Sequence, residues 1–159
     1  THQTTRMILR RLLGMDLKGK SVLDCGCGTG ILGIVASRLG ASHVLGYDID
    51  EWSSENAKHN AALNGVDNLD VLLGDASVLD GVKEEFDVVI ANINRNILLN
   101  DMPHFCQIMK QDAKLILSGF YTEDIPLLEA RGKELGLTLT GTKNRDKWAS
   151  IIMQRVNNA

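Results

Sequence analysis

A glycine-rich stretch near the amino terminus carries residues suited to binding a nucleotide-like ligand. It reads Leu23-Asp24-Cys25-Gly26-Cys27-Gly28-Thr29-Gly30 and lies between an apolar run and a helical pattern. Glycines allow a tight turn and a close approach of the backbone to a ligand, and the amino end of a helix adds partial positive charge. The stretch therefore predicts a cofactor-binding loop.

Asp48 is the expected partner of this loop. It ends the next β-rich run, 22 residues beyond Gly26, and a carboxylate at this place accepts hydrogen bonds from both hydroxyls of a ribose. Together the loop and the acid are far more specific than either alone. An empty structural turn is the weaker alternative.

Asp24 indicates which ligand fits. Gly28, Gly30 and Gly33 match the spacing of a dinucleotide fingerprint, but that register starts four residues after Asp24, late for a turn that follows the strand directly. In the register that starts at Gly26, Asp24 is the last strand residue and lies beside the ligand. Its charge repels a pyrophosphate and suits a cation. S-adenosylmethionine carries an ammonium and a sulfonium and no phosphate, so we expect it rather than a nicotinamide cofactor.

The cysteines do not indicate a metal site. Cys25 and Cys27 flank Gly26 with a spacing of one residue and lack a second clustered pair, which disfavours zinc. Cys106 is expected in the core beneath a helix. We therefore expect no metal ligands.

The elements that must position these residues alternate between short β-rich runs and helical patterns. The expected strands are Lys20–Asp24, His43–Asp48, Leu69–Leu73, Phe86–Ala91, Lys114–Ser118, Leu137–Lys143 and Trp148–Arg155. The expected helices are 2–13, Thr29–Leu39, Asp50–Asn64, Asn96–Lys110 and Glu123–Leu135, the fourth ended or kinked by Pro103. This order predicts an α/β fold, namely a Rossmann-like, seven-stranded, mostly parallel sheet with helices on both faces and an antiparallel C-terminal hairpin.

The composition narrows the class of protein. The 159 residues, 44% hydrophobic and 23% charged, fit one soluble globular domain. A net charge of −3 argues against charge-driven binding to nucleic acid or an anionic membrane. No apolar run reaches the ~20 residues of a membrane span. Three cysteines form no disulfide framework and no signal peptide is visible, so we expect a reduced, cytoplasmic setting.

The motifs resemble those of class I S-adenosylmethionine-dependent methyltransferases. Asp24–Gly30 is similar to their first motif and Gly46–Asp50 to their second. In that family the acid after the second strand binds the ribose, the acid after the third lies near the adenine, and the loop after the fourth faces the reacting centre. The resemblance gives these places to Asp48, Asp75 and Ala91–Asn94.

Other segments resemble the PrmA family, the methyltransferases of ribosomal protein L11. Thr1-His2-Gln3-Thr4-Thr5 is similar to its Gly-Thr-His-x-Thr-Thr signature without the leading glycine, and Asn92-Ile93 matches its Asn-Ile after the fourth strand. Ser118-Gly119 and Asp146-Lys147-Trp148 are similar to its later segments. The resemblance covers essentially the whole chain.

This resemblance implies an enzyme that moves a methyl group from S-adenosylmethionine to amino groups of a protein, ribosomal protein L11. Methyl transfer is an in-line displacement, in which the protein mainly holds both reactants in attack geometry. We expect Asn92 as the catalytic residue, orienting the acceptor amine through its side-chain oxygen, and no general base. The expected cofactor-binding residues are Thr5, Asp24, Gly26, Gly28, Gly30, Asp48, Asp75 and Asn92.

The chain departs from the family in two places. PrmA proteins carry an N-terminal domain that presents the ribosomal protein, and residues 1–159 contain none of it, so we expect a methyltransferase domain alone. The family follows Asn-Ile with small residues, whereas Asn94-Arg95-Asn96 is bulkier and polar. The alternatives are a same-fold methyltransferase of a small molecule or RNA, and a silent S-adenosylmethionine-binding module. The loop lacks the prolines and aromatic ring that hold a flipped base, so we expect no direct contact with nucleic acid.

Overall fold

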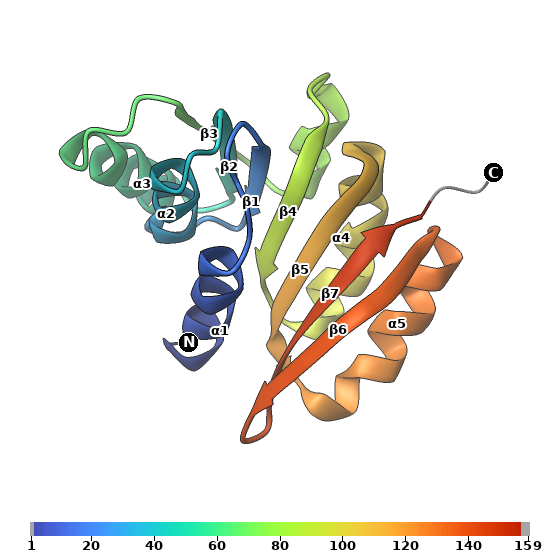
Figure 1. Cartoon of the computed structure of the whole chain (residues 1–159). Coiled ribbons are helices and arrows are strands. Elements are labelled where there is room, and N and C mark those ends of the chain that lie inside the picture. Colours follow the sequence, from blue (N-terminus) through green and yellow to red (C-terminus); the bar gives the residue numbers. More distant parts are fainter. Residues whose placement is uncertain (1, 157–159) are drawn as a thin grey trace.

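Seven strands form one mixed sheet in the computed structural model, which describes residues 2–156 (Figure 1). Thr1 of the signature lies outside these residues. The strands are β1 Ser21–Cys25, β2 His43–Asp48, β3 Leu69–Leu73, β4 Phe86–Asn92, β5 Met109–Tyr121, β6 Leu137–Arg145 and β7 Trp148–Arg155. The helices are α1 His2–Leu13, α2 Ile31–Arg38, α3 Glu51–Leu63, α4 Arg95–Gln107 and α5 Ile125–Glu134, with short 3₁₀ helices η1 Ala76–Gly81 and η2 Thr122–Asp124.

β1 lies inside the sheet, whose strand order is β3-β2-β1-β4-β5-β7-β6. It pairs in parallel with β2 and β4, and β3 and β5 extend the parallel part on either side. β7 pairs antiparallel with β5 and β6, and a bulge shifts the β6 register between Leu139 and Gly141. The prediction of a seven-stranded, mostly parallel, Rossmann-like sheet with an antiparallel C-terminal hairpin is confirmed.

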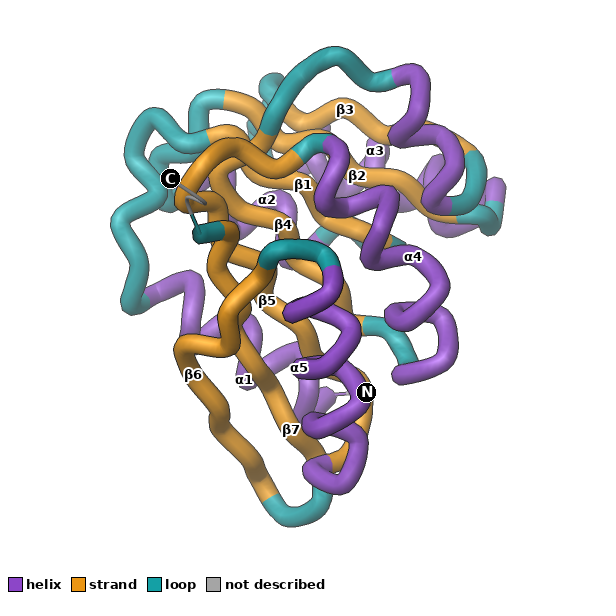
Figure 2. The backbone as a smooth tube through the Cα atoms, turned by 90° about the vertical axis from the view of Figure 1, so that its right-hand side faces the viewer, coloured by secondary structure: helices purple, strands orange, loops and turns teal. Residues whose placement is uncertain are grey.

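Helices cover both faces of the sheet, as predicted. α1, α2 and α3 lie on one side, and α4 and α5 lie on the other (Figures 1 and 2). The side chains of β1 divide accordingly, because Val22 packs in the cluster under α1 and α2 while Leu23 joins the larger cluster under α4 and α5. All five residues of β1 are buried, which explains why this strand has no polar face.

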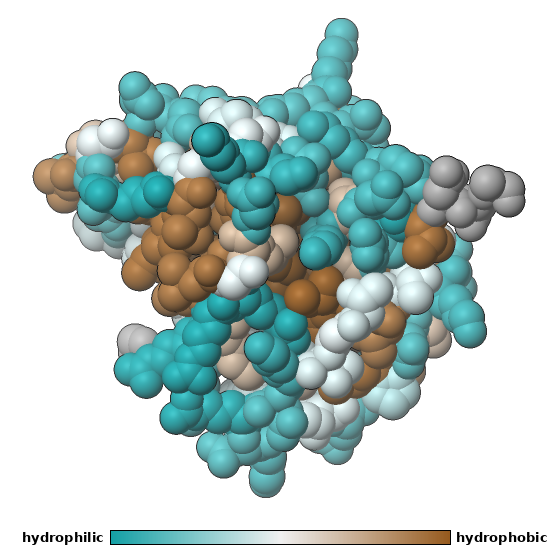
Figure 3. Space-filling model, in the orientation of Figure 1, coloured by the Kyte–Doolittle hydropathy of each residue, from teal (hydrophilic) through white to brown (hydrophobic). Residues whose placement is uncertain are grey.

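The outer surface of the first layer is mixed. Hydrophilic atoms cover most of the face in Figure 3, and an apolar area lies beside α1 and α2. Exposed apolar side chains of these helices include Leu13 and Ile31. Within residues 2–156, no helix has the length and apolar character needed to cross a bilayer.

The carboxyl ends of the parallel strands meet at one edge of the sheet, and this edge positions the site. The loops after β1, β2, β3, β4 and β5 lie there. α1 reaches the same region because buried Arg11 anchors it to β7: Nε donates to Ser150 Oγ at 2.8 Å and Nη2 donates to Ser150 O at 2.9 Å. The long first helix is thereby fixed beside the loops.

Several predicted boundaries were wrong. The strand expected at Lys114–Ser118 is part of a longer β5, because Met109 already pairs with Phe86 at the start of β4. The helix expected at Asn96–Lys110 therefore ends at Gln107. The helix expected at Glu123–Leu135 begins at Ile125, after the tighter η2 turn. The 3₁₀ helix η1 was not predicted.

Pro103 does not end α4. A proline removes the amide that would bond the carbonyl four residues earlier, which here is that of Leu99. Arg131 of α5 donates from Nε to Leu99 O at 3.4 Å. The neighbouring helix thus satisfies a carbonyl that proline leaves unpaired, and α4 continues to Gln107.

We expect His43 to make stability depend on pH. Its Nδ1 lies 2.7 Å from Glu84 Oε1 and its Nε2 lies 2.7 Å from Asp70 Oδ2. Partial burial opposes the ring's charge, but the two hydrogen bonds outweigh it and raise the pKa of His43 above its usual value. This stabilisation is complete below about pH 6.5 and is lost as pH rises through the folded-state pKa.

His43→Gln should remove that part of the pH dependence. The contribution to the free energy of unfolding is on the order of 1 kcal/mol or less, because His43 and its two carboxylate partners are partly exposed. The measurement is the free energy of unfolding in urea from pH 5 to 8. His59→Gln, at an exposed position on α3, is the matched control. A parallel pH profile for wild type and His43→Gln would contradict this account.

Candidate active site

The glycine loop turns back on itself between β1 and α2. Gly26, Gly28 and Gly30 have φ of 65°, 53° and 83°, in the left-handed region that favours glycine. Gly30 is also constrained by space, because a Cβ there would lie 3.1 Å from the Cβ of Ala57 in α3. The amide of Cys27 donates to the carbonyl of Tyr47 in β2 at 2.9 Å, which fixes the loop against the next strand.

The Asp48 carboxylate joins this loop to the end of β2. Its Oδ2 accepts from the amide of Gly28 at 2.9 Å, and its Oδ1 accepts from the amide of Asp50 at 2.9 Å. Asp50 in turn caps α3 by accepting from Trp52 N at 3.2 Å. Each oxygen of Asp48 keeps capacity for another donor, so the carboxylate is held in place and can still bind a ligand.

Asp24 is buried beneath the loop. It is 3% exposed, and its Oδ2 has no hydrogen-bond partner among the described residues. Burial raises the pKa of Asp24 to about 7, the nearby charge of Asp48 adds to the rise, and the Gly33 amide opposes it. A buried carboxyl with a spare oxygen is suited to a cationic ligand, whose charge would favour the ionised form.

Thr5 and Asn92, which belong to two separate segments of the expected family signature, lie next to each other in the structure. Asn92 ends β4, and its Nδ2 donates to Thr5 Oγ1 of α1 at 3.1 Å, across 87 positions of sequence. This bond fixes the orientation of the amide. The buried Oδ1 of Asn92 has no partner within residues 2–156, so the site holds an acceptor atom for an incoming N–H group.

Ile93 and Gly119 hold the next turn, and reasoning from the sequence placed Ile93 in the loop after β4 without predicting its contacts. The amide of Ile93 donates to Ser118 O at 2.9 Å. Gly119 has φ of 97°, and a Cβ there would lie 2.8 Å from Ile93 N and 3.0 Å from Asn92 Oδ1. The side chain of Ile93 also reaches the glycine loop, 3.5 Å from the Cβ position of Gly26. The glycines at positions 26 and 119 mark places where another segment comes close, and they were the sequence signal that could have indicated this contact.

Asp75 lies near the other residues, but its carboxylate is engaged locally. The amide of neighbouring Gly74 donates to Asp48 O at 2.8 Å, which brings the ends of β2 and β3 together. The Asp75 carboxylate accepts from the amide of Ser77 at 3.0 Å and from its hydroxyl. These hydrogen bonds lower the pKa of Asp75. Asp75 thus caps η1 at the rim of the site.

Cys25 and Cys27 act as packing residues in this arrangement. Burial raises the pKa of the Cys25 thiol well above its usual value, and burial beside Asp24 and Asp48 raises that of Cys27 to about 12. Neither is a thiolate near neutral pH. Across the described residues, no three His, Cys, Asp or Glu side chains are placed to hold a metal ion.

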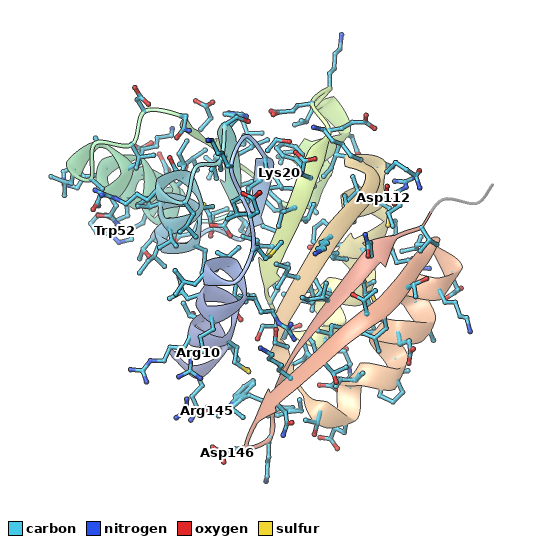
Figure 4. The ribbon with its side chains drawn as sticks, in the orientation of Figure 1. Arg10, Lys20, Trp52, Asp112, Arg145 and Asp146 are labelled. Atoms are coloured by element: carbon cyan, nitrogen blue, oxygen red, sulfur yellow. The ribbon has the colours of Figure 1, made fainter. Side chains whose placement is uncertain are left out.

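A cavity of about 380 Å³ opens beyond the Asn92 turn, between the start of α4 and the end of β5. It is lined by Asn94, Arg95, Asn96, Gly119, Phe120, Tyr121, Glu123 and Asp124. A second hollow of about 420 Å³, whose lining includes Lys20 and Asp112, lies at the amino ends of the strands. Figure 4 places Lys20 and Asp112 far from the hairpin tip marked by Asp146. The first cavity is therefore the one that adjoins the expected site.

Comparison with known proteins shows to which family this chain belongs. Residues 1–156 match the model of the family described as ribosomal protein L11 methyltransferase (PrmA). The chain belongs to the PrmA family. Two curated PrmA relatives, both named ribosomal protein L11 methyltransferase, come from Porphyromonas gingivalis and Phocaeicola vulgatus. They are 52% and 49% identical over 150 residues and 94% of this chain.

A solved structure shares the fold of this PrmA chain closely. It is a crystal structure of a ribosomal protein L11 methylase from Lactobacillus delbrueckii subsp. bulgaricus, with a TM-score of 0.91 and 32% sequence identity, covering 99% of this chain and 81% of that one. The chain spans about half the length of the curated relatives, 51% and 53%.

Replacing Asp24 by asparagine should stabilise the free protein and flatten its pH dependence. A raised folded-state pKa means that stability is complete below the unfolded pKa near 3.8 and is lost as pH rises to about 7. Above pH 7 the loss is on the order of a few kcal/mol. Asp24→Asn removes the charge at nearly constant shape.

The measurement is the melting temperature from pH 4 to 8, with exposed Asp67→Asn as the matched control. We expect Asp24→Asn to melt higher than wild type at pH 8 and the two to converge near pH 4. An unchanged or lower melting temperature at pH 8 would show that the buried charge carries no such penalty.

Proposed function

We propose that this chain is the catalytic methyltransferase domain of a PrmA-type enzyme, with S-adenosylmethionine as cofactor and amino groups of ribosomal protein L11 as acceptors. The observation that carries the proposal is the Gly28–Asp48 hydrogen bond, which joins the glycine loop to the ribose-binding acid in a chain that matches the PrmA family over residues 1–156. The choice of acceptor is supported by the relatives, which are named ribosomal protein L11 methyltransferase. A cytoplasmic location, and no direct contact with nucleic acid, follow as part of the proposal.

The residues present fit this cofactor. Two buried acceptor atoms without partners in the described chain, Asp24 Oδ2 and Asn92 Oδ1, belong to the site. Asp24 and Asp48 provide negative charge suited to a ligand with an ammonium and a sulfonium. The glycine loop gives the ligand room and backbone amides. Thr5, Asp24, Gly26, Gly28, Gly30, Asp48, Asp75 and Asn92 are the proposed cofactor-binding residues.

Bound S-adenosylmethionine supplies a methyl group already activated by its sulfonium. The protein's part is to hold the acceptor. Asn92 is oriented by Thr5, and its free Oδ1 accepts an N–H of the acceptor amine so that the nitrogen lone pair is directed for in-line attack. An amine of pKa ~10.4 is largely protonated at neutral pH. It must lose a proton before it reacts, and partial desolvation beside half-buried Ile93 and Gly119 favours the neutral form.

The first test is binding of S-adenosylmethionine by isothermal titration calorimetry. We expect the wild-type chain to bind, and Asp48→Ala to lose about 10- to 100-fold in affinity because hydrogen bonds to a charged group are removed. Asp67→Ala, at an exposed loop position, should bind like wild type. Absence of binding by the folded wild-type chain would overturn the proposed function.

The second test addresses the Thr5–Asn92 hydrogen bond. Thr5→Val keeps the shape but removes the acceptor, so Asn92 loses its fixed orientation and kcat should fall about five- to tenfold. Thr5→Ser should restore most of it. The assay follows labelled methyl transfer from S-adenosylmethionine to purified ribosomal protein L11, with RNA and small-molecule pools as competing acceptors. A rise in the cofactor KM at constant kcat would show that Thr5 binds the cofactor without orienting Asn92.

A further inference from the structure

The cavity beyond Asn92 contains the polar segment in which this chain departs from the family pattern. Asn94, Arg95 and Asn96 form one wall, and the end of β5 with η2 forms the other. The cavity adjoins the buried Oδ1 of Asn92 through Gly119, whose Cβ position lies 3.0 Å from that oxygen. A group seated in the cavity is therefore next to the proposed reacting centre.

Arg95 does not act as a free cation in this cavity. Its Nη1 lies 3.0 Å from Asp124 Oδ1, and the Asp124 side chain is 10% exposed. The other oxygen of Asp124 accepts from the amide of Tyr121 at 2.9 Å. The ion pair is thus held by backbone on one side, and it fixes the start of α4 against the end of β5. The positive charge of Arg95 is matched by Asp124.

Glu123 is left as the uncompensated charge of the cavity lining. Its side chain is exposed, and it takes part in no hydrogen bond or ion pair within residues 2–156. Beside it, Tyr121 is 42% exposed, and its ring stacks on that of Trp148, with centroids 4.6 Å apart and planes at 27°. Aromatic faces attract cations as carboxylates do, so this lining favours a positively charged group.

That group is not the amine that reacts. A carboxylate near an amine stabilises its protonated form, and a protonated amine has no lone pair for attack. Glu123 would slow transfer if it paired with the reacting nitrogen. It assists transfer if it binds a different cation of the same acceptor and leaves the neutral amine to Asn92.

We propose that this cavity is a recognition subsite for a basic side chain that flanks the methylated amine in the protein acceptor. Glu123 and the Tyr121 ring bind the flanking cation, and the Arg95–Asp124 pair positions the wall between the subsite and the Asn92 turn. Glu123 is therefore a specificity-determining residue of the acceptor. The inference rests on the proposed function and adds to it a sequence requirement in the acceptor.

The experiment measures peptide binding by backbone amide NMR, which suits a chain of 17.4 kDa and needs no turnover. The probes are short alanine peptides with a free amino terminus that carry one lysine at the second, third or fourth position. Each has a partner with norleucine, which has a similar length without the charge. Glu123→Gln is the test variant, Glu123→Lys reverses the charge, and Glu129→Gln, exposed on α5, is the matched control.

We expect wild type and Glu129→Gln to bind at least one lysine peptide roughly two- to fivefold more tightly than its norleucine partner, as for an exposed ion pair. The preference should shrink in high salt, vanish in Glu123→Gln and reverse in Glu123→Lys, with shifts at Asn96 and Tyr121. The same preference in wild type and Glu123→Gln, shifts confined to the opposite hollow at Lys20, or no binding of any peptide would overturn the subsite. Calorimetry with S-adenosylmethionine separates the two proposals, because a chain that binds the cofactor but shows one of these results retains the proposed function and loses the subsite alone.

Discussion

Parallel pairing of β1 with strands on both sides is the constraint on which the site depends. Because β1 lies between β2 and β4 in one register, the glycine loop, Asp48 and Asn92 end at the same edge. The same pairing buries β1 on both faces, and with it Asp24, whose register partners are Gly46 and Ile90. A carboxyl group in such a strand is costly to ionise, and under the proposed function the positive charge of the cofactor offsets that cost.

The sequence predicts well what depends on local pattern. Continuous apolar runs and the placement of glycines were enough to predict a mostly parallel sheet, the glycine loop and its Asp48 partner. Each of these features is set within one strand–helix–strand unit. Pairwise contacts between distant segments were beyond such reasoning. Nothing in the residue types at positions 5 and 92 indicates that Thr5 of α1 accepts a hydrogen bond from Asn92. The same holds for Arg95 and Asp124, which form a hydrogen bond between the start of α4 and η2.

The wrong boundaries have the same origin. Residues 109–113 have no strong strand pattern, and β5 begins with them because Met109 pairs with Phe86 of β4. Pro103 predicts a break when α4 is considered alone, whereas Arg131 of α5 supplies the donor that α4 lacks. Asp75 illustrates another limit: the resemblance placed it near the adenine, and a serine two residues later, which that reasoning did not consider, engages its carboxylate locally.

The bulge in β6 alters the edge strand of the sheet. β6 is the outermost strand beside β7, and an edge strand offers unpaired backbone groups on which another chain can add. After the shift between Leu139 and Gly141, the strand continues through exposed Lys143 and Arg145. Irregular backbone followed by like charges discourages a second copy from aligning there. The C-terminal hairpin thereby protects the protein against edge-to-edge association.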